Sequence, residues 1–269
     1  LIIKSINKIN KMQTTDLVGA AESIMTTDTF PKTCIKKVEI ENEKIKIYGF
    51  AKGSGMIQPN MGTMLVYIFI EGLINKFQLK KLIHNNIEDS FHSISVDSDT
   101  STSDTLMLFS ISNKKINLKS KKNFNLISKG LFDVMQNLAY QVIKDGEGLS
   151  KIIKINVKNA KTSIQAKKIA FSIVNSPLVK TAIAGEDANW GRIIMAIGKS
   201  YEKINQNLIK IKFGDIIVCS NGHVQKKINY KKLNNYMKKK IIEIQVDLGL
   251  GPYSKTVIGN DLTYKYIKI

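Results

Sequence analysis

The chain has 269 residues and a formal net charge of +19 at pH 7, and 43% of its residues are hydrophobic. A chain of this length can bury one large core or two smaller ones, and the hydrophobic content is normal for a soluble globular protein. No apolar run approaches the ~18 residues that a membrane-spanning helix needs. The first residues also lack the charged-then-apolar layout of a signal peptide. The sequence therefore predicts a globular protein without a membrane partner.

The positive charge comes almost entirely from lysine, because Arg192 is the only arginine. Proteins that read a nucleic-acid groove favour arginine, whose planar guanidinium bonds guanine through two hydrogen bonds. Runs such as Lys238-Lys239-Lys240 are more typical of a solvated face than of a polyanion site. We therefore expect no nucleic-acid partner.

Cysteine and histidine positions exclude two further kinds of site. Cys34 and Cys219 lie far apart in the sequence, which fits reduced thiols of a cytoplasmic protein better than a disulfide framework. The three histidines, His84, His92 and His223, show no metal-ligand spacing with one another or with the cysteines. The sequence therefore predicts no metal site.

Periodicity and turn residues predict the secondary structure in chain order. A short helix is expected over 17–25, then a hairpin over 38–50 that turns at Asn42, and a fully buried strand over the apolar run 64–70. The remaining expected elements are a helix over 75–89, a long helix over 125–144, a strand over 151–157, a helix over 162–174, a helix that begins at Ser176-Pro177, strands over 209–219 and 241–248, and a terminal strand over 264–269. Because helices and strands intermingle without repeats, we expect a layered α/β sandwich.

The segment from Ala51 to Leu65 crowds glycines, a lysine and several hydroxyl or amide side chains into a short loop before an apolar strand. Gly62 precedes Thr63 at this junction, which is the layout expected of a threonine nucleophile freed by cleavage of the Gly62–Thr63 bond. A threonine hydroxyl needs a base, and the α-amine of a new N-terminus, with a pKa of ~8, can serve as one. Taken alone, Gly-Thr would more simply be a β-branched residue that opens a strand.

Other polar residues are candidates for substrate binding. Lys52 could hold a carboxylate or polarise a carbonyl, although it could equally be one more surface lysine. Glu147 lies between two glycines of a tight turn and could pair with an amino group, the alternative being a solvated acidic turn. Thr26 could hydrogen-bond a substrate, and Asp28 could cap a turn. The acidic run 97–104 lacks the spacing of a calcium loop and predicts a hydrogen-bonded structural loop near the site.

Taken together, these segments resemble the ornithine acetyltransferase (glutamate N-acetyltransferase) family. The run AKGSGMIQPNMGTML at 51–65 is similar to that family's self-cleavage motif, AKGSGMI-x-PNMATML. Further segments resemble family motifs in family order and cover nearly the whole chain, namely 24–32, 97–104, 145–148, 176–182, 185–192 and 259–264.

The resemblance implies a cytoplasmic enzyme of arginine biosynthesis with a layered αββα-like sandwich. Family members transfer an acetyl group from N2-acetylornithine to glutamate by a ping-pong route through an acetyl-threonine, and some also accept acetyl-CoA as a co-substrate; no other cofactor is implied. By position in the motifs, Thr63 is the implied nucleophile. Thr26, Lys52, Thr63 and Glu147 are the implied substrate-binding residues.

The resemblance also implies how the chain is divided. Cleavage between Gly62 and Thr63 would leave residues 1–62 as the C-terminal part of an α chain and residues 63–269 as a β chain with Thr63 at its N-terminus. The α and β chains are expected to remain associated, usually as a dimer of αβ pairs.

Two family features have no counterpart in this sequence. The family's oxyanion-hole Thr-Gly lies upstream of the cleavage motif, and no Thr-Gly pair occurs here; the family's C-terminal Asn and Thr or Ser are missing as well. We therefore expect the N-terminal part and the extreme C-terminus of the family to be absent. Loss of one oxyanion donor typically costs ~100- to 1,000-fold in turnover. Alternatives to the transferase are a related threonine-nucleophile amidase or aminopeptidase, and a non-catalytic, lysine-rich remnant.

Overall fold

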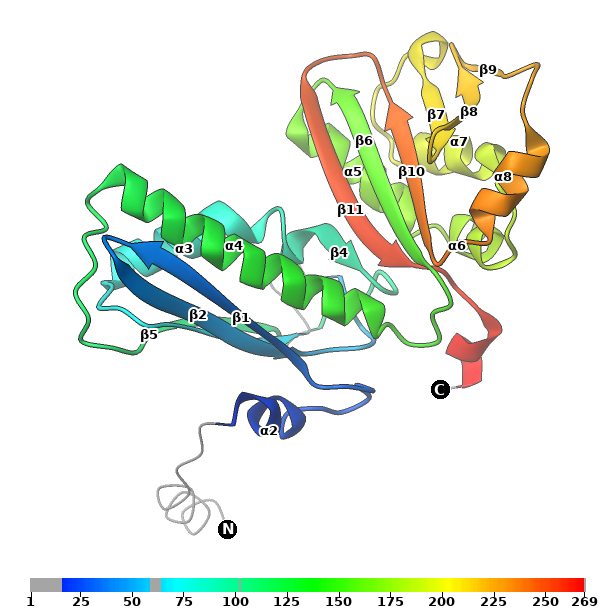
Figure 1. Ribbon diagram of the computed structural model, residues 1–269. Helices are drawn as coiled ribbons and strands as arrows, with labels where there is room; N and C mark the ends of the chain where they lie inside the picture. Colours follow the sequence, from blue (N-terminus) through cyan, green and yellow to red (C-terminus); the bar gives the residue numbers. More distant parts are fainter. Residues whose placement is uncertain (1–15, 59–63, 102, 269) are drawn as a thin grey trace.

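The structure is a computed structural model that describes residues 16–58, 64–101 and 103–268 (Figure 1). The chain folds into two α/β halves that meet near Ile152, each with its own mixed sheet and hydrophobic core. This arrangement confirms the expected mixed α/β class. Within the described ranges, no helix is both long enough and apolar enough to span a membrane.

The first half is built on a four-stranded sheet of order β1-β2-β3-β5. Its strands are β1 (Lys32–Ile40), β2 (Glu43–Lys52), β3 (Leu65–Ile70) and β5 (Thr105–Ser110). Helices α3 (Lys76–Ile87) and α4 (Lys121–Lys144) cover one face, and the short helix α2 (Leu17–Glu22) precedes the sheet (Figure 1). The expected hairpin is confirmed, with Glu41 and Asn42 at its turn in left-handed conformations (φ 50° and 67°).

Strand β3 differs from the fully buried strand that its apolar run predicts. Val66, Ile68 and Ile70 face the core, but the residues between them are only half-buried. One of these, Phe69, stacks on Phe109 at 5.1 Å between ring centroids and takes part in a stripe of aromatic rings along the face opposite α4, where the short helix α2 also lies. The run is apolar on both faces because one face packs in the core under α4 and the other carries these stacked rings.

Helix α4 positions the site, because its last turn carries the chain into the cleft described below. The Ser120 side chain caps its N-terminus by accepting a hydrogen bond from the Asn123 amide. One face is fully buried against the sheet, as the 3- and 4-residue spacing of its apolar residues predicts. The members of this face include Ile127, Leu131, Val134, Leu138 and Val142. Gly130 lies where a side chain would meet Ile47 and Val38, so glycine lets the helix approach the strands closely.

The second half holds a seven-stranded sheet of order β4-β11-β6-β10-β7-β8-β9. Its strands are β4 (Ile94–Ser95), β6 (Ile152–Ala160), β7 (Lys210–Phe213), β8 (Ile216–Ser220), β9 (His223–Val224), β10 (Ile241–Asp247) and β11 (Tyr253–Asn260). Its helices are α5 (Ser163–Val174), α6 (Pro177–Ala184), α7 (Trp190–Lys199) and α8 (Tyr230–Met237). Short 3-10 turns are η1 (Phe91–Ser93), η2 (Gln206–Leu208) and η3 (Tyr264–Lys268).

Two predictions for this half need correction. The expected strand over 209–219 is a hairpin, because Gly214 takes a left-handed turn (φ 56°) between β7 and β8. The expected terminal strand is instead η3, which folds back toward the end of α4 (Figure 1).

Lysine 180, on α6, links the two halves. Its Nζ donates hydrogen bonds to the Val96 carbonyl at 2.8 Å and to Asn260 Oδ1 at 3.1 Å, and also to the Asn260 carbonyl. The Asp261 carboxylate next in the chain accepts hydrogen bonds from the amides of Ser150 (2.8 Å) and Lys151 (3.0 Å). These contacts hold the end of β11 against the segment that follows α4.

Candidate functional site

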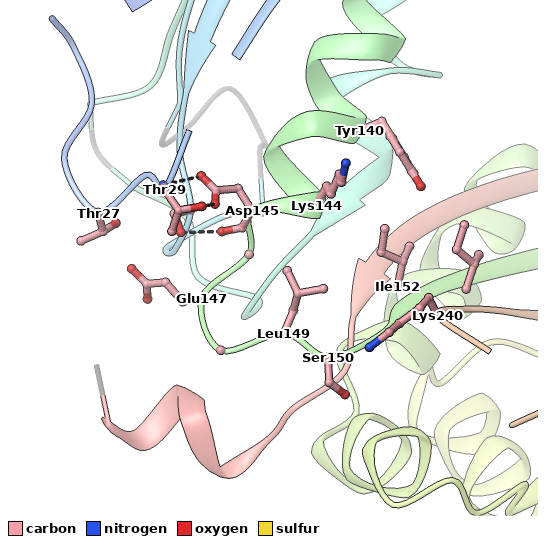
Figure 2. A pocket seen from close by; sticks show the side chains of 14 residues that line it. Thr27, Thr29, Tyr140, Lys144, Asp145, Glu147, Leu149, Ser150, Ile152 and Lys240 are labelled. Atoms are coloured by element: carbon pink, nitrogen blue, oxygen red, sulfur yellow. Dashed lines mark hydrogen bonds between the residues drawn. The ribbon is translucent and has the colours of Figure 1, made fainter. Parts of the chain in front are cut away.

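A cleft of about 640 Å³ opens where α4 ends and the chain passes into the second half (Figure 2). Four parts of the sequence line it: the segment before β1, the segment after β2, the segment from the end of α4 to the start of β6, and the start of β10. The lining residues are Thr27, Thr29, Ser54, Tyr140, Lys144, Asp145, Gly146, Glu147, Gly148, Leu149, Ser150, Ile152, Lys240 and Ile241.

Glu147 lies in this cleft on the turn that follows α4, as the sequence predicts. Its amide donates to the Ser54 carbonyl at 3.1 Å, and its carboxylate lies directly against Gly55, where an added Cβ would be 2.5 Å from Glu147 Cδ. Gly148 has φ 65°, and a Cβ there would be 2.7 Å from Tyr266 Cα. Glycine is required at 148, where the backbone has positive φ and an added Cβ would meet the backbone of Tyr266. At 55 the missing side chain leaves room for the Glu147 carboxylate.

The structure also brings Thr26 and Lys52 together. Lys52 Nζ donates to Thr26 Oγ1 at 3.3 Å, although 26 positions separate the two residues. Lys52 ends β2, and the next residues, Gly53 to Gly55, run past Glu147. Three of the predicted substrate-binding residues therefore lie on neighbouring segments. The predicted cleavage site and nucleophile, Gly62 and Thr63, lie outside the described residues.

A buried ion-pair cluster underlies these segments. Lys32 Nζ lies 2.6 Å from Asp28 Oδ1 and 2.5 Å from Asp145 Oδ2, and neither the lysine nor Asp28 exposes any side-chain surface. Burial opposes ionisation of Asp28, but hydrogen bonds from the Gly53 amide and Lys32 outweigh it and hold the pKa of Asp28 below its usual value. Asp28 does accept from the Thr26 amide, as a turn cap would, but it has these further partners.

Sequence reasoning missed Lys32 and gave Asp145 no role. Both residues lie inside motifs that resemble the family's, yet nothing in the local pattern marks them as buried. The neighbouring residues that stand out are a proline directly before Lys32 and a glycine directly after Asp145, and neither of them indicates a buried charge. Lys32 and Asp145 are 113 positions apart in the sequence, so only the fold brings them together.

The acidic run 97–104 is a hydrogen-bonded loop next to the site, which confirms the prediction. Asp97 accepts hydrogen bonds from the amides of Met56 (2.6 Å) and Ile57 (2.9 Å) and so holds the loop that follows Gly55.

Both carboxylate oxygens of Asp104 are buried without a hydrogen-bond partner in the described part of the chain, and burial raises the pKa of Asp104 to about 7 despite the nearby Lys52. Among the residues whose positions are described, no group of His, Cys, Asp and Glu could hold a metal ion.

Comparison with known proteins identifies the family to which this arrangement belongs. The model of the ArgJ family matches residues 1–269. This chain belongs to the ArgJ family. The resemblance drawn from the sequence motifs is thereby confirmed.

Curated members of the ArgJ family are similar over almost the whole chain. "Arginine biosynthesis bifunctional protein ArgJ" of Bartonella henselae is 45% identical over 253 residues, which cover 93% of this chain and 62% of the relative. The protein of the same name from Ruegeria pomeroyi is 44% identical over 269 residues, which cover 100% of this chain and 65% of the relative. The chain thus spans less than two thirds of the length of these relatives.

The fold agrees with a solved ArgJ structure. The crystal structure of "Arginine biosynthesis bifunctional protein argJ" from Bacillus halodurans superposes with a TM-score of 0.67 at 32% identity. The match covers 74% of this chain and 96% of the solved chain. Fold and sequence therefore point to the same family.

Proposed function

We propose that this protein transfers an acetyl group from N2-acetylornithine to glutamate, with acetyl-CoA as a second possible donor for glutamate. One observation carries the proposal: Thr26, Lys52 and Glu147, drawn from three separate motifs, lie on segments that are hydrogen-bonded to one another beside one cleft. Lys52 would pair with a substrate carboxylate, Glu147 with an amino group, and Thr26 with a carbonyl or hydroxyl oxygen. An amino acid carries both charges, so the set fits that substrate class.

The reaction follows from the chemistry of an N-terminal threonine. After cleavage of the Gly62–Thr63 bond, the α-amine of Thr63 takes the proton of its own hydroxyl, and the oxygen attacks the acetyl carbonyl of N2-acetylornithine. Ornithine leaves with a proton on its amine, and the acetyl group remains as an ester on Thr63. The amine of glutamate then attacks this ester, which forms N-acetylglutamate and restores the hydroxyl.

The sheet explains how two pieces could stay together after cleavage. Strand β2 lies before the proposed cleavage site and β3 after it, and they pair from Ile47–Ile70 to Lys52–Leu65. Division into 1–62 and 63–269 therefore cuts between strands of one sheet, while their ladder and the shared core remain. We propose association into αβ pairs on this basis. A dimer of two such pairs is proposed from the family resemblance.

The length of the solved relative further supports division of the chain before Thr63. Because the match covers 74% of this chain and 96% of the Bacillus halodurans chain, that chain is about three quarters as long as this one. A piece from residue 63 to residue 269 would have about the same length. A match of that extent is also far longer than residues 1–62.

The finer architecture and location are also proposals. Rings of Tyr48, Phe50, Phe69 and Phe109 form an aromatic stripe on the face of the first sheet opposite α4. A second sheet on that face would complete an αββα layering. Both cysteines are free thiols, which supports the cytoplasm as the location.

Two measurements test the function. Intact mass should show two pieces divided at residue 62, and Thr63→Val should leave a single uncut chain. Isotope-labelled N2-acetylornithine should pass its acetyl group to glutamate, and Thr63→Val should abolish the transfer.

Other outcomes would overturn the proposal in distinguishable ways. Release of acetate without any need for glutamate would indicate an amidase. An uncut chain that binds nucleic acid with a steep salt dependence would indicate the non-catalytic, lysine-rich alternative.

A further inference from the structure

Lys32 is fully buried, although its side chain carries a charge. It lies at the start of β1, between Asp28 on the preceding segment and Asp145 at the end of α4. Its Nζ contacts Asp28 Oδ1 at 2.6 Å and Asp145 Oδ2 at 2.5 Å, and the three side chains expose 0%, 0% and 2% of their surface. Lys32, Asp28 and Asp145 are called the buried triad below.

Each carboxylate of the buried triad also holds backbone of a site segment. Asp28 accepts from the Gly53 amide at 2.7 Å, directly after Lys52, and from the Thr26 amide at 3.2 Å. Asp145 accepts from the Thr29 amide at 2.9 Å and from the Thr29 hydroxyl.

The link to Glu147 runs through Ser54. The Asp145 carbonyl accepts from Ser54 Oγ at 2.6 Å, and the Ser54 carbonyl accepts from the Glu147 amide at 3.1 Å. Every segment that presents Thr26, Lys52 or Glu147 is therefore one or two hydrogen bonds from the buried triad.

Stability alone does not account for such a cluster. Two carboxylates and one ammonium leave a net negative charge out of water, and the desolvation of buried ions commonly cancels their mutual attraction. An apolar cluster of the same volume would often stabilise a protein as well or better. Ionic hydrogen bonds, however, are directional, and they fix the positions of the backbone amides that they bind.

We propose that Lys32 is a positioning residue, which acts through Asp28 and Asp145 to hold Thr26, Lys52 and Glu147 in the relative placement that substrate binding needs. This inference rests on the proposed function, and it adds a residue that does not itself line the cleft. If Lys32 is replaced, both carboxylates lose their shared partner and repel each other. This repulsion should move apart the two loops that the carboxylates hold. Because ~1 Å of misplacement can cost about 100-fold in rate, acetyl transfer should then slow.

The test compares Lys32→Met with Lys255→Met in the full chain. Lys255 offers a matched control: its side chain is 9% exposed, and its Nζ donates to Asp89 Oδ1 at 2.7 Å and to the Glu88 carbonyl at 2.6 Å, outside the cleft. Both variants should lose stability. At a temperature where both remain folded, Lys32→Met should lower kcat/KM for acetyl transfer at least 10-fold, mostly through KM, while Lys255→Met should stay within about 3-fold of the wild type.

If Lys32→Met does not fold, Asp28→Asn takes its place, since it keeps the volume and an oxygen acceptor for the Gly53 amide. We expect a rise in KM of roughly 3- to 10-fold for this variant. Equal kinetic effects of Lys32→Met and Lys255→Met, or unchanged kinetics in Asp28→Asn, would overturn the proposal.

A second readout separates this inference from the function on which it rests. Hydrogen exchange of the Gly53, Thr26 and Thr29 amides should speed up in Lys32→Met, or in Asp28→Asn, and not in Lys255→Met at matched global stability. A wild type that transfers no acetyl group would refute the proposed function, while the exchange result would still decide whether Lys32 positions these segments. Unchanged protection of all three amides would overturn the positioning role.

Discussion

Gly55 is the position where a single methyl group should separate function from stability. The Glu147 carboxylate lies against Gly55, and a Cβ added there would be 2.5 Å from Glu147 Cδ and 2.8 Å from Oε1. Ordinary contacts begin at about 3.4 Å, so Gly55→Ala must displace the carboxylate by about 1 Å. Because the displaced group is the end of a flexible side chain, the backbone need not move, and the free energy of unfolding should change by less than about 1 kcal/mol.

The expected functional loss is larger. A hydrogen bond to a charged group contributes about 1.5–3 kcal/mol, and displacement of the Glu147 carboxylate by about 1 Å should remove most of it. With ~1.4 kcal/mol for each tenfold change, Gly55→Ala should raise KM for glutamate or N2-acetylornithine roughly 10- to 100-fold.

The assay measures acetyl transfer and thermal unfolding of Gly55→Ala beside Gly198→Ala. Gly198 lies in α7 with no atom within 4 Å of an added Cβ, so its variant should keep wild-type kinetics. In a Glu147→Ala background, Gly55→Ala should cause no further loss. Wild-type kinetics in Gly55→Ala, or an equal further loss in the Glu147→Ala background, would refute the role assigned to the Glu147 carboxylate.

Three further predictions concern stability. Burial lowers the pKa of Lys180 from 10.5 to about 8, so the unfolded state binds more protons between these values, and the free energy of unfolding should rise by about 2 kcal/mol from about pH 7 to 9.5 relative to Lys180→Met, as measured by urea titration. Burial opposes ionisation of Glu88, but hydrogen bonds from Lys167 and His92 lower its pKa from 4.5 to about 2. The resulting stability is present above pH 4.5 and lost toward pH 2, and Glu88→Gln should remove this acid dependence. The effect is at most about 1 kcal/mol, because the side chain is 54% exposed. Leu131→Ala should lower the free energy of unfolding by about 2–5 kcal/mol, measured by calorimetry, because Leu131 is fully buried under the first sheet. The Lys180 prediction would be contradicted if wild type and Lys180→Met showed the same pH dependence of stability, and the Glu88 prediction if Glu88→Gln kept the wild-type loss of stability in acid. A loss below about 1 kcal/mol in Leu131→Ala would contradict the third.

Regular one-sided burial was the easiest feature to predict. The long helix expected over 125–144 is α4 (Lys121–Lys144), and the hairpin turn expected at Asn42 lies there. Strand β11 (Tyr253–Asn260) was missed, because its early residues are polar and it becomes a strand only by pairing with β6. The aromatic face of β3 was misread for the opposite reason: apolar residues on both faces look alike in sequence whether helices or other rings cover them.

The resemblance of short motifs to those of the family indicated Thr26, Lys52, Thr63 and Glu147 as candidate site residues, and these roles stay predictions. Local sequence could not place the buried triad, since the environment of Lys32 is made by a carboxylate 113 residues away. Periodicity reports which side of an element is apolar, because that depends on neighbours three or four positions apart. Which charges lose their contact with water depends on how distant segments pack, and that information exists only after the chain has folded.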